Sequence, residues 1–80
     1  MITKNQLPDF VGAAIERFKA DNRLGDVAYN DDLKRIIEET TGAPLYDGAV
    51  ADIREEMIRR QRDGLGVEAA TISGSAWRFK

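Results

Sequence analysis

Three segments of the chain repeat apolar residues at helical spacing, and this repetition limits the possible folds more than any other feature of the sequence. The segments are residues 7–21, 30–42 and 46–64. Their apolar stripes are Leu7, Val11, Ala14, Ile15 and Phe18; Leu33, Ile36, Ile37 and Thr40; and Val50, Ile53 and Met57, with Ala49 and Ile58 at the edges. Amphipathic helices bury such stripes against one another, so a small core built from three helices is predicted.

Residues typical of helix ends accompany these stripes. Asn5, Asn30 and Asp47 suit the N-cap positions of the three helices, because each side chain can accept a hydrogen bond from a free backbone N–H. Pro8 suits a first turn, where its missing N–H costs nothing. Gly42 suits the residue that follows the second helix.

Two further segments favour β-structure. Residues 26–30 are short and β-leaning, and residues 67–80 form a predicted hairpin after the third helix. Within this hairpin Trp77 and Phe79 alternate with Arg78 and Lys80, so the aromatic residues share one face and the cations share the other. We expect the aromatic face to cover the helical core.

The sequence leaves the register of this hairpin open. A three-residue loop at 73–75 places Glu68 opposite Lys80 and Thr71 opposite Trp77. A two-residue turn at 74–75 places Ile72 opposite Trp77 instead.

The composition argues against most catalytic chemistry. The 80 residues include no cysteine and no histidine, which excludes disulfides and thiolate nucleophiles and makes a zinc site improbable. The two serines both lie in the expected hairpin turn. We therefore expect no enzyme, no cofactor and no metal.

The sequence shows neither a signal-peptide pattern nor an apolar run long enough to span a bilayer, so a cytoplasmic protein without a membrane partner is expected.

The order of these elements is helix, short strand, helix, turn, helix, strand, strand, and it resembles the winged helix-turn-helix superfamily. The resemblance is strongest in "TGAPLYDGAVADIREEM", residues 41–57, where a turn of small residues precedes the third helix. It implies an α+β fold in which residues 1–80 form a single winged-helix domain. The short strand then lies between helices 1 and 2, the third helix is the recognition helix, and the C-terminal hairpin is the wing.

This resemblance also implies a DNA-binding protein, such as a transcriptional regulator or accessory factor, whose third helix and wing contact double-stranded DNA. The chain carries a net charge of -2, with six Lys/Arg against nine Asp/Glu in residues 1–47 and six against five in residues 48–80. The residues expected on phosphates are Arg54, Arg59, Arg62, Arg78 and Lys80, and those expected nearest the bases are Tyr46, Asp47, Gly48 and Ala51. A domain this small has little surface for tight DNA binding, so a homodimer is a further possibility.

A second hypothesis keeps the same scaffold without DNA. Glu55 and Glu56 precede Arg59 and Arg60 by four residues, a spacing that forms ion pairs along a helix. The start of the third helix is acidic, which disfavours contact with phosphates. The alternative is therefore a protein–protein interaction module or inhibitor.

Overall fold

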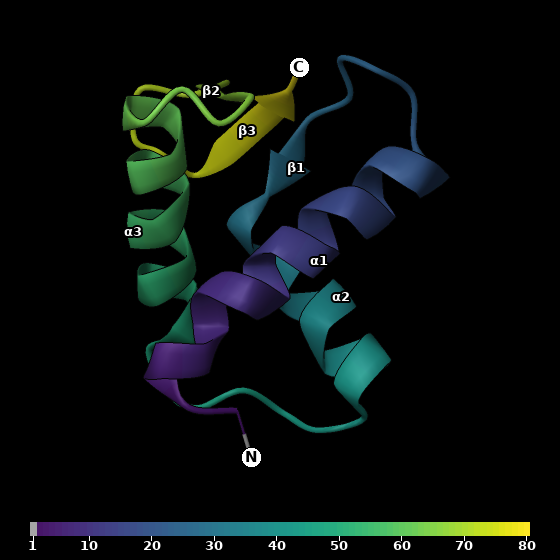
Figure 1. Ribbon diagram of the computed structural model, residues 1–80, viewed down its shortest axis with the longest axis vertical. Coiled ribbons are helices and arrows are strands. Elements are labelled where there is room, and N and C mark those ends of the chain that lie inside the picture. The colour runs from purple at the N-terminus through teal and green to yellow at the C-terminus, as the bar shows by residue number, and fades with distance from the viewer. Residues whose placement is uncertain (1) are drawn as a thin grey trace.

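A computed structural model describes residues 2–80, which fold into three helices and a three-stranded antiparallel sheet. The helices pack on one another, and the sheet lies at one end of the molecule between α3 and the C-terminal part of α1 (Figure 1). The elements are a 3-10 turn, η1 (Lys4–Gln6), α1 (Leu7–Asp21), β1 (Ala28–Tyr29), α2 (Asn30–Thr41), α3 (Ala49–Arg62), β2 (Val67–Ala69) and β3 (Ala76–Phe79). The predicted α+β class and element order are therefore confirmed.

The core contains most of the three helical stripes together with the inner face of the sheet. In α2 the prediction is wrong for Thr40, which is exposed, and Ile36 is only half-buried. Trp77 is 1% exposed, and the ring of Phe79 meets that of Phe18 edge to face at 5.7 Å. The prediction that the hairpin aromatics cover the helices is thus confirmed. The stripe of α3 is rotated slightly from its predicted position, because Ala49 is buried and Val50 is only half-buried.

Strand β3 is the central strand of the sheet, with β1 on one side and β2 on the other. Ala28 of β1 and Ala69 of β2 both lie opposite Trp77, and Glu68 lies opposite Arg78. Both predicted registers are wrong, since neither Thr71 nor Ile72 faces Trp77.

The reason is a longer hairpin loop, residues 70–75. Its ends are joined by a hydrogen bond from the Ala70 N–H to the Ala76 carbonyl (2.9 Å), and the Thr71 hydroxyl accepts a second bond from the Ser75 N–H (3.0 Å). Gly74 takes the left-handed conformation that the loop requires. Side-chain bonding inside the loop thus replaces the tight turn expected from the sequence.

Asn30 connects this loop to α2. The Asn30 amide donates a hydrogen bond to the Gly74 carbonyl (3.0 Å) and accepts one from the indole N–H of Trp77 (2.7 Å). The Asn30 backbone N–H also donates to the Ser75 carbonyl (3.0 Å). Asn30 is 6% exposed, so these bonds lie inside the protein.

The predicted N-cap role of Asn30 is therefore wrong. Asn30 is the first residue of α2, and its side chain is turned into the core instead of toward the helix end. The carboxylate of Asp32 takes over at this end by accepting a bond from the Tyr29 N–H (2.9 Å).

The N-cap predictions for the other two helices are also wrong. The N-cap position of α3 is occupied by Gly48 and not by Asp47, which lies one residue earlier. Gly48 has φ of 84°, a left-handed conformation that glycine adopts easily because it has no Cβ. Helix α1 is preceded by η1, where the Gln6 side chain accepts a bond from the Thr3 N–H (3.0 Å), and Asn5 caps neither element. Gly42 follows α2 with φ of 72°, as predicted.

Replacing Asn30→Ala should lower the free energy of unfolding by about 2–4 kcal/mol, because the indole N–H and the Gly74 carbonyl lose their buried partner. Urea denaturation followed by circular dichroism measures this loss. Asn5→Ala is the control: Asn5 is exposed, so a change below about 0.5 kcal/mol is expected. Equal losses in the two variants would contradict the proposed importance of Asn30.

Candidate functional site

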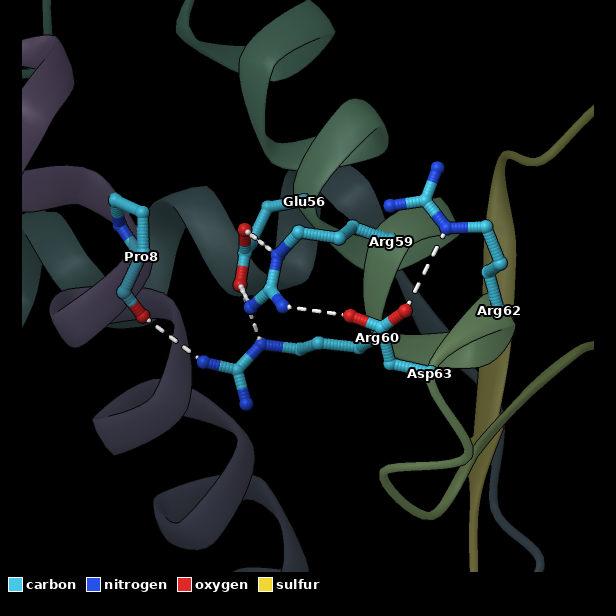
Figure 2. A network of polar contacts seen from close by, with 6 residues as sticks. All are labelled: Pro8, Glu56, Arg59, Arg60, Arg62 and Asp63. Carbon is cyan, nitrogen blue, oxygen red and sulfur yellow. Dashed lines mark hydrogen bonds and ion pairs between the residues drawn. The ribbon is translucent and has the colours of Figure 1, made fainter.

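Glu56 lies at the centre of the polar contacts of α3. The side chain is only 7% exposed, and its carboxylate accepts hydrogen bonds from Arg59 (2.7 and 3.0 Å) and Arg60 (2.7 Å). Arg60 reaches on to α1, where it donates to the Pro8 carbonyl at 3.0 Å (Figure 2). The bond from Arg59 is the main reason why the pKa of Glu56 is lowered. One buried carboxylate therefore holds two arginines and helps to fasten α3 to α1.

The remaining ion pairs of this network involve Asp63, just after α3. Asp63 contacts Arg59 at 3.0 Å and Arg62 at 3.5 Å, as Figure 2 shows. The predicted pair of Glu56 with Arg60 is confirmed, whereas the predicted pair of Glu55 with Arg59 is wrong. Arg59 turns toward Glu56 because this carboxylate is buried beside α1, where an ion pair is less screened by water.

Arg54 connects α3 with the hairpin loop. Its Nε donates to the Ser73 carbonyl at 3.1 Å, and its Nη1 lies 3.4 Å from the carboxylate of Glu55. The Arg54 guanidinium packs closely on Gly74, where an added Cβ would lie 3.1 Å from its Nε. Because Arg54 holds one side of the loop and Asn30 the other, the loop has a fixed position beside the first half of α3.

The residues expected nearest to DNA bases lie around the start of α3. Asp47, Gly48 and Ala51 are exposed. Tyr46 is half-buried, and its hydroxyl donates to Asp52 at 2.8 Å. Burial and then this hydrogen bond raise the pKa of Tyr46 to about 12. The phenol of Tyr46 is thus engaged within the protein.

The expected cations of the hairpin point away from the core. Arg78 and Lys80 are exposed on the face of the sheet opposite Trp77 and Phe79, which is the face turned away from the core. On this outer face Lys80 lies 3.7 Å from Glu68. The alternation of the strand therefore turns Arg78 and Lys80 to solvent.

One surface of α3 faces solvent, and we call it the outer α3 face: Ala51, Glu55, Ile58 and Arg62. These residues follow one another at intervals of four, three and four, which places them on one side of a helix. The side chains of Glu55 and Arg62 are 71% and 70% exposed, and Ile58 is half-buried. Arg59, which is expected on phosphates, turns instead toward the buried Glu56. Ile58 lies at the edge of the buried stripe, as predicted, and packs partly against the core. The helical spacing of Ala51, Glu55, Ile58 and Arg62 is the signal of this face in the sequence.

Ile72, which one predicted register places opposite Trp77, lies instead in the hairpin loop next to Ser73. Its side chain is fully exposed. It carries no charge and belongs to no apolar stripe, so the sequence offers no sign of this exposure. The outer α3 face and the loop residues 71–75 together make up the candidate binding surface.

The described residues also form hollows. One of about 260 Å³ lies between the start of α1 and α3, beside Pro8, Glu55 and Arg59. A polar groove of about 480 Å³ runs between the end of α1 and α2, where Asp21, Asp32 and Glu39 accompany Arg35. A smaller apolar pocket of about 100 Å³ lies beside Phe18 and Phe79. Within residues 2–80 no group of three or more acidic side chains is arranged to hold a metal ion.

Comparison of the chain with protein-family models, curated proteins and solved structures found no match. In the described part of the chain, none of the helices has the length and apolar character needed to cross a membrane.

Replacing Glu56→Gln should lower the free energy of unfolding by about 1–3 kcal/mol at pH 7, because two arginines lose their charged acceptor. The lowered pKa gives the pH dependence: ionised Glu56 stabilises the fold above the ordinary glutamate value of 4.5, and this stability is lost as the pH falls through the lower folded value. Urea denaturation at several pH values should show the two proteins converging in acid.

Glu55→Gln is the matched control, because the Glu55 side chain is 71% exposed. Its unfolding free energy should stay within about 0.5 kcal/mol of the original at every pH. If the difference in unfolding free energy between Glu56→Gln and the original protein stays the same in acid, the ionised carboxylate is not the cause of that difference.

Proposed function

We propose that this chain is a protein–protein interaction module with a winged-helix architecture, and that the candidate binding surface contacts the partner. The observation that carries the proposal is the engagement of the α3 arginines. Arg59 and Arg60 each bond to the buried carboxylate of Glu56 at 2.7 Å, and Arg59 also contacts Asp63 at 3.0 Å. A phosphate backbone would have to compete with these carboxylates for the same cations.

The distribution of charge supports the same conclusion. Asp47, Asp52 and Glu55 lie in and just before the first half of α3, where Arg54 is the one arginine of the helix. Such a surface repels phosphates, whereas mixed charges around small apolar patches are common where proteins meet.

The winged-helix architecture is supported by the arrangement of elements. The order of helices and strands agrees with the resemblance noted in the sequence, and the C-terminal hairpin loop is bonded to the third helix through Arg54 and Ser73. In this architecture the third helix and the wing form one continuous surface, and many different partners can be recognised by changing its side chains.

Double-stranded DNA is the second candidate partner, and Arg54 is the observation that favours it. This arginine lies where α3 meets the hairpin loop, its side chain is 45% exposed, and the Arg62 side chain further along α3 is 70% exposed. These two cations lie on the surface that the winged-helix resemblance assigns to DNA.

Fluorescence anisotropy of a labelled random duplex separates these two candidates. We expect no saturable binding at micromolar protein, even at low salt. Binding that weakens steeply with rising salt, and that Arg54→Ala and Arg62→Ala abolish, would instead establish DNA as the partner. Arg17→Ala is the control, since Arg17 is an exposed arginine on α1.

A photo-cross-linking residue, p-benzoylphenylalanine, tests the protein-binding surface directly. Placed at Ala51 on the outer α3 face, it should give a stoichiometric protein adduct after illumination in extract of the source cells. Ala13 is also exposed and lies on α1, so the same residue placed there is the control. Adducts of equal yield from both positions, or no adduct from either, would contradict the proposed surface.

A further inference from the structure

We propose that the partner on the outer α3 face is a second copy of this chain, docked with its α3 antiparallel to the first. The inference rests on the proposed function, because it assigns a partner to the same surface. Two observations carry it: the arrangement of charges along the outer α3 face, and the exposure of these charged side chains.

The charges of this face are self-complementary. Glu55 and Arg62 are seven residues apart, about 10 Å along the helix, with Ile58 between them. When two such helices lie antiparallel across a twofold axis near Ile58, Glu55 of each copy meets Arg62 of the other. A parallel arrangement would instead place Glu55 against Glu55, so the charges select the antiparallel one.

Both charges are available for this contact. The Glu55 and Arg62 side chains are 71% and 70% exposed, and within the chain each has only a loose contact with a sequence neighbour, at 3.4 Å to Arg54 and 3.5 Å to Asp63. Glu56 and Arg60, in contrast, are 7% and 19% exposed and already bonded to each other. The outer α3 face thus presents the charges of α3 that are least engaged in the fold.

Ile72 adds an exposed apolar side chain beside this face. It is fully exposed on the loop that Arg54 holds beside α3. In the proposed dimer this loop lies next to the second copy, so Ile72 loses contact with water.

The geometry also sets the strength of the dimer. Helix α3 has 14 residues and is about 21 Å long, so a contact along one face and one loop is smaller than a standard protein interface. We therefore expect a weak dimer in equilibrium with the monomer. Dimerisation covers Ala51 and Arg54, so it would compete with any DNA contact made by α3.

Sedimentation velocity at protein concentrations from about 5 to 500 µM tests the dimer, since weak complexes need the upper part of this range. The original protein should shift from monomer to dimer as concentration rises. Glu55→Arg and Arg62→Glu should each raise the dissociation constant about tenfold or more, because each creates two like-charge contacts across the twofold axis.

The double variant Glu55→Arg/Arg62→Glu exchanges the two charges and should restore dimerisation to within about threefold of the original. Glu16→Arg is the matched control, because the Glu16 side chain is 75% exposed on α1, and it should leave the dissociation constant unchanged. Circular dichroism of each variant checks that the fold is retained.

A monomer throughout the concentration range would overturn the inference. So would a dimer that the single charge reversals do not weaken, or one that the double variant does not restore, since another surface would then hold the two copies together. The proposed function fails separately, through the DNA and cross-linking measurements, because a different protein bound at Ala51 would support it even if the chain is a monomer.

Discussion

The buried amide of Asn30 is the interaction on which the arrangement of the sheet depends. Strand β2 has three residues and β1 has two, and strands this short are not stable by themselves. By bonding to both Trp77 and the Gly74 carbonyl, Asn30 fixes the hairpin to the start of α2. The position of the loop beside α3, and with it the candidate binding surface, follows from this attachment.

Helix α3 shows why the number of arginines in a segment is a poor measure of its affinity for polyanions. A single buried glutamate, Glu56, engages Arg59 and Arg60, and the latter also reaches the backbone of α1. These arginines contribute to the packing of two helices. The most exposed charges of α3 are those of Glu55 and Arg62, with Arg54 beside the hairpin loop. This pattern suits a partner that carries both signs.

The helices could be predicted from the sequence because their burial follows from a local period. The stripe of α1 is buried along its whole length, and both bounds of that helix agree with the prediction. Features that depend on contacts between distant residues could not be found in this way. Asn30 resembles an N-cap residue in the sequence, but its hydrogen-bond partners lie 44 and 47 residues away. No local sequence pattern indicates these partners. The register failed for a similar reason, because hydroxyl bonds within residues 70–75 lengthen the loop.

The surroundings of Trp77 have a consequence for spectroscopy. The indole is buried, and its N–H is bonded to the residue that begins α2. Its emission therefore monitors the docking of the hairpin on the helices and is insulated from events at the outer α3 face. The chain thus contains an internal optical probe of its own assembly, and this probe stays silent while a partner binds unless binding moves the sheet.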